Sequence, residues 1–167
     1  MPQKVWYAPN KFESYGEEEI KAVEACLRDG WLAGFGDRSM EFEKRVADIF
    51  GKRHGLFVNS GSSAILLGLC ALDLPRGSEV VTPACGFATT VAPLVQLGLK
   101  PVFCDVGLTT YVPSVDDLKK VVTSETKCII LPNLIGNVPD WKAIREAFPE
   151  VILFEDSADT ITKNECT

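Results

Sequence analysis

The pattern of apolar and polar residues along the chain changes near residue 51. Before that point, apolar side chains recur every three or four positions in two stretches, at Ile20, Val23 and Leu27 and then at Phe42, Val46 and Ile49. This spacing predicts two amphipathic helices. The first begins at Ser14, with Glu17 in a capping box, and ends at Gly30; the second ends at Gly51. Beyond residue 51, short β-rich runs alternate with helical stretches.

Five apolar runs in this second part predict β-strands, over residues 55–59, 79–82, 101–105, 127–131 and 151–155. Helices are predicted between them, over residues 62–72, about 89–97, 115–122 and 139–148. Ser114 with Asp117, and Asn137 before Pro139, are the expected helix starts. The runs are apolar on both faces, which is typical of a parallel sheet covered by helices on both sides. The expected fold is therefore α/β, with three layers and mostly parallel strands.

Composition and charge narrow the class of protein. The 167 residues are 46% hydrophobic and 24% charged, enough for one domain with a sizeable core. The net charge of -6 argues against a protein that binds a nucleic-acid backbone. The apolar runs fall short of the roughly 18 residues that a membrane span needs, and no secretory signal pattern is present. We therefore expect a cytoplasmic protein that binds neither nucleic acid nor membrane.

The cysteines and the single histidine suggest no metal site. No two cysteines form a CxxC pair, and most lie in apolar runs, so we interpret them as reduced core thiols. They are Cys26, Cys70, Cys85, Cys104, Cys128 and Cys166. His54 precedes a predicted strand and is expected at the surface.

Ligands of open α/β sheets bind at the carboxyl ends of the strands. In this chain those positions are rich in glycine and small polar residues, over residues 60–63, 83–87, 133–137 and 156–159. Gly61, Ser62 and Ser63 open a predicted helix, whose free N–H groups and partial positive charge attract a phosphate. Ser62 as a plain helix cap is the alternative, and by itself it is the favoured one.

Two further residues change that balance. Asp156 follows a fully apolar strand, where an ionised carboxylate needs a cationic partner such as a protonated pyridine nitrogen. Phe87 follows another strand and could lie flat against an aromatic ring. Taken alone, Asp156 could cap a turn and Phe87 could belong to the core. A phosphate cradle, a ring platform and a pyridinium partner together describe one ligand, pyridoxal 5'-phosphate (PLP).

The chain resembles the N-terminal part of the DegT/DnrJ-type PLP-dependent sugar aminotransferases and dehydratases, which have the aspartate aminotransferase fold (type I). The segments that carry the resemblance run in the family's order through nearly the whole chain: "GWLAGFG", "NSGSSA", "VVTPACGFATT", "LIGNVPD" and "FEDSAD". The resemblance implies that residues 1–36 form an N-terminal helix and loop arm, and that residues 37–167 form the N-terminal part of a truncated PLP-binding large domain. It also implies the cofactor contacts: Gly61, Ser62 and Ser63 at the phosphate, Phe87 on the ring and Asp156 at the ring nitrogen. Asp159 is expected to bind the cofactor as well, and both Asp156 and Asp159 are expected to serve catalysis.

Some details point to one branch of the family. Asp159 stands three residues after Asp156, where the aminotransferases usually have Gln or His, and the segments resemble the sugar-nucleotide 3-dehydratases. Those enzymes use PLP or pyridoxamine 5'-phosphate, with a His in place of the Schiff-base Lys. The implied function is 3-dehydration or transamination of a keto-sugar nucleotide in the biosynthesis of deoxysugars, aminosugars and surface polysaccharides. Asn133 departs from the family, which usually has His there. Lys163 follows Asp159 too closely to be the Schiff-base lysine.

Family members are much longer, and the residue that bonds to PLP lies in their later part. Residues 1–167 are therefore expected to be an incomplete fold, with a homodimer formed by the full-length protein. The alternatives are a non-catalytic module that holds a phosphorylated ligand, or half of a split enzyme completed by a separate C-terminal segment. An unrelated nucleotide-binding domain is disfavoured, because no GxGxxG follows any strand.

Overall fold

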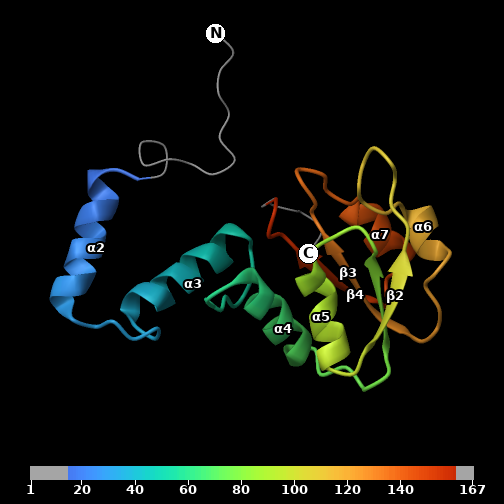
Figure 1. Cartoon of the computed structure of the whole chain (residues 1–167), viewed down its shortest axis with the longest axis horizontal. Helices are drawn as coiled ribbons and strands as arrows, with labels where there is room; N and C mark the ends of the chain where they lie inside the picture. The colour runs from blue at the N-terminus through green and yellow to red at the C-terminus, as the bar shows by residue number, and fades with distance from the viewer. Residues whose placement is uncertain (1–14, 161–167) are drawn as a thin grey trace, which may run out of the picture.

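The computed structural model describes residues 15–160, in which two helices precede a unit of four helices and four strands built around one sheet (Figure 1). In chain order the elements are α2 Glu17–Asp29, α3 Asp37–Ile49, α4 Gly61–Ala71, β1 Glu79–Pro83, α5 Ala88–Gln96, β2 Lys100–Cys104, α6 Val115–Lys119, β3 Thr126–Pro132, α7 Trp141–Ala147 and β4 Ile152–Asp156. No helix among these is long and apolar enough to cross a membrane.

The four strands form one parallel sheet in the order β2-β1-β3-β4. Each matches a predicted strand within one residue at either end, so the parallel α/β prediction is confirmed. The register aligns Pro83 with Cys104 and Pro132 with Asp156. The carboxyl ends of all four strands therefore lie at one edge of the sheet, where the polar loops follow.

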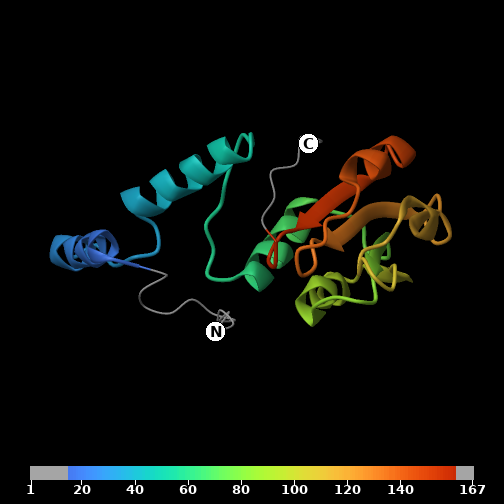
Figure 2. The same cartoon turned by 90° about the horizontal axis from the view of Figure 1, so that it is seen from above.

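Helices cover both faces of this sheet, as Figure 2 shows. On one face α4 and α5 contribute Ile65, Leu69 and Leu94 to a core with alternate strand residues such as Ile130. On the other face α6 and α7 enclose Ile129 and the neighbouring strand residues. Alternation along β3 explains the two cores, because successive side chains of a strand point to opposite faces. The predicted three layers are confirmed.

Helix α4 approaches β4 closely. A Cβ atom at Gly68 would lie 2.7 Å from the ring of Phe154, so only glycine allows this contact without a shift of the ring. The packing brings the first turn of α4 to the carboxyl end of β4, since parallel strands and their helices share one edge.

The fifth predicted strand, at residues 55–59, does not form within residues 15–160. This segment has no regular secondary structure and pairs with no strand of residues 15–160. It packs instead along α3, where the Phe57 N–H donates to Glu43 Oε1 at 2.7 Å and the rings of Phe42 and Phe57 meet edge to face at 5.1 Å. An apolar run becomes a strand only where another strand can accept its backbone hydrogen bonds.

Two helix starts differ from the predictions, and one is confirmed. The N-cap of α2 is Gly16, whose N–H donates to the Glu19 carboxylate at 2.7 Å; Ser14, the predicted cap, lies outside the described residues. Helix α7 begins after Asp140 and not after Asn137, because the Asp140 carboxylate accepts the Ala143 N–H. Ser114 and Asp117 form the predicted capping box of α6, although this helix is shorter than predicted.

The prediction that the cysteines are core thiols holds only in part. Cys104 and Cys128 are buried, and burial raises their thiol pKa to about 11 and about 12. Cys70 and Cys85 are exposed, and Cys26 is half-buried. Cys70 lies on α4 next to buried Leu69, on the side of the helix that faces away from the sheet. Cys166 and Lys163 lie outside the described residues.

Candidate functional site

The first turn of α4 presents free backbone donors at the carboxyl edge of the sheet. Its N-cap is Ser60, not Ser62: the Ser60 hydroxyl accepts the Ser63 N–H at 3.1 Å and donates to the Ser63 hydroxyl oxygen at 3.1 Å. Gly61 and Ser62 occupy the first two helical positions, and N–H groups there have no acceptor within a helix. Because Ser60 already caps the helix, the Ser62 hydroxyl and these N–H groups have no partner within residues 15–160 and are available to a ligand.

The start of α5 places an aromatic ring and a hydroxyl beside this turn. Phe87 is the N-cap residue of α5, and its side chain is 72% exposed. A large apolar ring at such exposure is available to cover a ligand. One turn later, Thr90 is buried and points to the end of β4.

Asp156 ends β4 as a buried carboxylate, 8% exposed. Its Oδ2 accepts the Thr90 hydroxyl at 2.8 Å, and its Oδ1 accepts the Ala158 N–H at 3.2 Å. None of the ion pairs formed within residues 15–160 involves Asp156. Burying an ionised carboxylate without a cation is costly, so this site favours a positively charged ligand group.

These groups surround one cavity of about 250 Å³, which lies between the first turn of α4, the start of α5 and the loop after β4. Five of the six predicted site residues line it: Gly61, Ser62, Phe87, Asp156 and Asp159. Ser63 is not among the lining residues; Ser60 accepts its N–H and donates to its hydroxyl oxygen. The lining described here contains two carboxylates and no basic side chain.

Sequence patterns did not identify several lining residues. Thr90, Thr89, Ile65, Pro132, Leu134 and Ala158 also face the cavity. The signal for Thr90 was present in "GFATT": a residue three positions after Phe87 on a helix faces the same side as the helix start. Ile65 lies one turn after Gly61 on α4 by the same rule. Leu134 lies within residues 133–137, one of the segments predicted at the carboxyl ends of the strands, and Pro132 is the last residue of β3 before that segment.

The loop after β3 is held in a strained conformation at the rim of the cavity. Ile135 has φ of 51°, in the left-handed region, which is costly for a β-branched residue. Neighbouring groups hold the loop: the Gly136 N–H donates to Thr160 Oγ1 at 2.7 Å, and Asn137 Nδ2 donates to the Leu134 carbonyl at 3.0 Å. The loops after β3 and β4 are therefore joined to each other.

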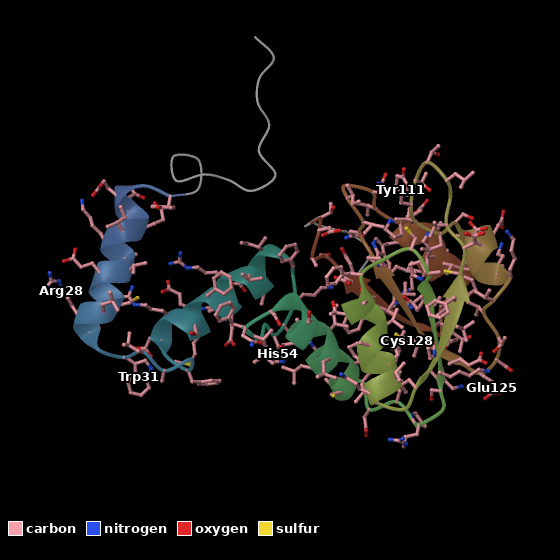
Figure 3. All side chains as sticks on the ribbon, viewed as in Figure 1. Arg28, Trp31, His54, Tyr111, Glu125 and Cys128 are labelled. Atoms are coloured by element: carbon pink, nitrogen blue, oxygen red, sulfur yellow. The ribbon has the colours of Figure 1, made fainter. Side chains whose placement is uncertain are left out.

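Groups remote from the cavity take no part in it. His54 is exposed and lies between α3 and α4, and Trp31 lies on the loop between α2 and α3, away from the sheet (Figure 3). Cys128 lies inside the sheet in the same view. The expected surface position of His54 is confirmed. No group of three or more His, Cys, Asp or Glu side chains within residues 15–160 is arranged to hold a metal ion.

Known proteins are similar to this chain in sequence and in fold. It is 41% identical over 155 residues to dTDP-4-dehydro-2,6-dideoxy-D-glucose 3-dehydratase of Saccharopolyspora spinosa, a match that covers 87% of this chain and 33% of that protein. A crystal structure of GDP-4-keto-6-deoxymannose-3-dehydratase with a trapped PLP-glutamate geminal diamine has a TM-score of 0.84 at 32% identity, covering 92% of this chain and 42% of that chain. The structure of NtdA from Bacillus subtilis with bound pyridoxamine 5'-phosphate (PMP) has a TM-score of 0.78 at 28% identity, covering 87% and 35%.

The chain thus spans less than half of the length of each of these relatives. The two structures nevertheless cover 92% and 87% of this chain, so the aspartate aminotransferase fold is confirmed for the part of it that this chain contains. The model of one family matches residues 13–164, nearly the whole chain. The chain belongs to the DegT/DnrJ/EryC1/StrS aminotransferase family.

Proposed function

We propose that this chain is the cofactor-binding part of a PLP-dependent enzyme that acts on a keto-sugar nucleotide. The observation that carries the proposal is the buried Asp156 carboxylate, which has no basic partner within residues 15–160 and shares a cavity with the free N–H groups of the α4 N-terminus. These are the two features that a ligand with a cationic ring nitrogen at one end and a phosphate at the other requires.

The donor set fits PLP or PMP group by group. Ser62 and the Gly61 N–H bind the phosphate. Ser63 does not line the cavity as described, but its hydroxyl hydrogen is not used in the bond from Ser60, and we expect it to turn toward the phosphate. Phe87 covers one face of the ring. Asp156 keeps the ring nitrogen protonated, and Thr90 holds the Asp156 carboxylate in that orientation. When bound, the cofactor supplies an electron sink for a carbanion formed on the substrate side.

We further propose 3-dehydration or transamination of a keto-sugar nucleotide as the reaction, in deoxysugar, aminosugar or surface-polysaccharide biosynthesis. Two of the relatives described above are named as 3-dehydratases of dTDP- and GDP-linked sugars, and the family is named for aminotransferases. Asp159 favours the dehydratases. Asp159 lines the cavity three residues after Asp156, and we propose that Asp159 has a catalytic role near the ring nitrogen.

The assembly and location of the protein are part of the same proposal. We propose a cytoplasmic homodimer, or a pair of chains in which a separate C-terminal segment completes the site, with residues 1–36 as an arm ahead of the cofactor domain. Apolar side chains on α2 and on the loop after it support contact with another part of the protein, because Val23, Leu27 and Trp31 are all more than half exposed.

The proposal is tested on the protein expressed from its complete coding sequence. Purified protein is mixed with PLP, and binding is followed by absorbance and by retention of the cofactor through gel filtration. Treatment with sodium borohydride then distinguishes a lysine enzyme, in which the cofactor becomes fixed to the protein, from a histidine enzyme, in which it remains releasable.

Substrate assays decide the reaction. GDP-4-keto-6-deoxymannose and a dTDP-4-keto-6-deoxy sugar are incubated with the protein and glutamate, and products are identified by mass spectrometry. Loss of the 3-hydroxyl supports the dehydratase, and gain of an amine supports the aminotransferase. PLP binding without turnover of either class would support the non-catalytic module, and the absence of PLP binding would contradict the proposed function.

A further inference from the structure

Asp156 is held from both faces of the sheet. Successive residues of β4 point to opposite faces, so Phe154 and Asp156 face α4 and α5, whereas Leu153 and Glu155 face α7. Thr90 holds Asp156 on the cavity side. On the other side, the structure provides a second and larger set of contacts around Asn133.

Asn133 directly follows β3 and is fully buried, with 0% exposure. Its backbone N–H donates to the Asp156 carbonyl at 2.9 Å, which extends the β3–β4 pairing by one residue. Its Nδ2 lies 2.6 Å from Glu155 Oε1, 3.2 Å from Ser157 Oγ and 3.4 Å from the Thr160 carbonyl. One side chain therefore contacts residues on both sides of Asp156 and the far end of the loop that carries Asp159.

The orientation of this amide is determined by its other end. Trp141 Nε1 donates to Asn133 Oδ1 at 3.2 Å, and the Trp141 ring is buried at the start of α7. An indole N–H can only donate, so it selects the amide oxygen and turns the NH₂ group toward Glu155. Ser157 Oγ completes the arrangement by donating to the same Glu155 oxygen at 2.8 Å.

We propose that Asn133 is a positioning residue, whose amide fixes the carboxyl end of β4 from the face opposite the cavity and so fixes the direction of the Asp156 carboxylate. Asparagine suits this role because its NH₂ group has two hydrogens for the acceptors on Glu155 and the following loop, while its oxygen remains free for Trp141. A histidine at position 133 would offer less: if one ring nitrogen accepts the Trp141 N–H, only one N–H remains to donate to Glu155 or the loop, compared with two in asparagine. The inference rests on the proposed function, because PLP is its probe.

The test is a swap of donor and acceptor in the protein expressed from its complete coding sequence. Asn133→Asp keeps the shape of the side chain but removes both N–H donors and sets a carboxylate against Glu155. We expect PLP affinity to fall about tenfold, with a changed absorption spectrum of bound PLP, and amide exchange over residues 155–160 to accelerate by about tenfold. Asn133→Asp combined with Glu155→Gln restores the hydrogen bond in the reverse direction, and we expect it to recover most of both losses.

Thr123→Val is the matched control. It removes a side-chain hydroxyl near the amino ends of the strands that makes two hydrogen bonds of similar length. Thr123 Oγ1 donates to Glu79 Oε2 at 2.7 Å and accepts the Glu125 N–H at 3.1 Å. PLP affinity and exchange over residues 155–160 should then match the parent. If Asn133→Asp does not fold, Trp141→Phe serves instead: it removes the indole N–H that binds the amide oxygen, replaces a buried ring with a smaller one, and should weaken PLP binding by about threefold.

The outcomes separate this inference from the proposed function. A parent protein that binds no PLP would overturn the proposed function. If the parent binds PLP, the proposed function stands, and any one of three results would overturn the role of Asn133 alone. These results are equal PLP binding by Asn133→Asp, a folded double variant without recovery, and unchanged PLP affinity in Trp141→Phe. Recovery in the double variant supports the role, because general loss of packing is not reversed by exchanging a donor with its acceptor.

Discussion

Strand β3 and helix α2 show how the same kind of sequence signal can have two outcomes. Both have regularly placed apolar residues, yet six of the seven residues of β3 are buried and none of α2 is. In Figure 1 and Figure 2, β3 lies inside the sheet with helices on both sides, while α2 lies away from the sheet. Apolar spacing indicates which face of an element is suited to burial, but burial itself requires a partner surface.

The difference extends to whole regions. Residues 61–156 contain two packed cores, one on each face of the sheet. Ahead of them, Ala47 is the one residue of α2 and α3 that is buried among the described residues. We infer that the first region carries its own packing and that the second is shaped for contact with something else, such as the rest of the full-length protein or a second copy of it.

Among the tests of this comparison, expression of residues 1–167 alone should show the largest change in stability. Strand β4 ends the sheet of the described residues, and its outer edge has backbone N–H and C=O groups along an apolar run. Each unmet buried group costs about 1–3 kcal/mol, and whole-domain stability is only about 5–15 kcal/mol. We expect this chain to aggregate or to unfold without cooperativity, as measured by light scattering and calorimetry. Supplying the later segment in trans should restore cooperative folding. A soluble, cooperatively folding and catalytically active 167-residue protein would contradict this.

Two matched isoleucines provide a residue-level form of the same test, in the protein expressed from its complete coding sequence. Ile130→Ala removes a fully buried side chain from β3, and we expect urea unfolding to show a loss of about 2–5 kcal/mol. Ile20 lies half-exposed on α2 in the described structure. Ile20→Ala should still cost about 1 kcal/mol or more if another surface covers α2, whereas a change below about 0.5 kcal/mol would mean that α2 remains in solvent.

Asp156→Asn tests whether the packed region also carries the chemistry. The substitution keeps the shape of the side chain and its position beside Thr90 but removes the charge that holds the proton on the ring nitrogen. We expect turnover to fall by about 10²–10³-fold, the range found for loss of one charge-stabilising group. Circular dichroism should be unchanged. Near-normal turnover would remove Asp156 from the mechanism.

Ser62→Glu tests the opposite end of the cavity. A carboxylate at the first turn of α4 repels a phosphate and fills its space, so PLP retention through gel filtration should be lost, by about a hundredfold in affinity. Cys70→Glu, on the exposed side of the same helix, is the control, and it should retain PLP. If Ser62→Glu holds PLP as tightly as the parent, the phosphate binds elsewhere.

The sequence was sufficient for features determined by near neighbours and insufficient for those determined by distant ones. The four paired strands and the Ser114–Asp117 capping box follow from local pattern, and all were predicted within a residue. The run at 55–59 failed because strand formation depends on a partner that residues 15–160 do not contain. The position of Thr90 one turn into its helix was readable from "GFATT", but its hydrogen bond to Asp156 was not, because Asp156 is 66 residues away.

The loop after β3 shows the same limit inside the candidate site. Its departure from the family pattern at Asn133 was visible in the sequence, but not the contacts that result. These contacts join Asn133 to residues 22 to 27 positions later and to the Trp141 ring. Only the parallel pairing of β3 with β4 brings these groups together, so the network becomes predictable once the strand order is known.

The smallest expected effect compares helix caps in the two regions. Ser114→Ala removes the cap of α6, whose residue Leu118 is fully buried, and we expect a loss of about 1 kcal/mol in the free energy of unfolding at pH 7. Hydrogen bonds from Lys120 and then from Ser114 lower the pKa of Asp117 from 3.8 to about 2. A lowered folded-state pKa adds stability that is present above pH 4 and is lost as the pH falls through about 2. The difference between parent and Ser114→Ala in urea unfolding should therefore narrow below pH 4.

Glu19→Gln weakens the corresponding cap of α2 and should change the unfolding free energy less, because α2 contributes no buried residue. An equal effect at both caps would show that α2 unfolds together with the sheet.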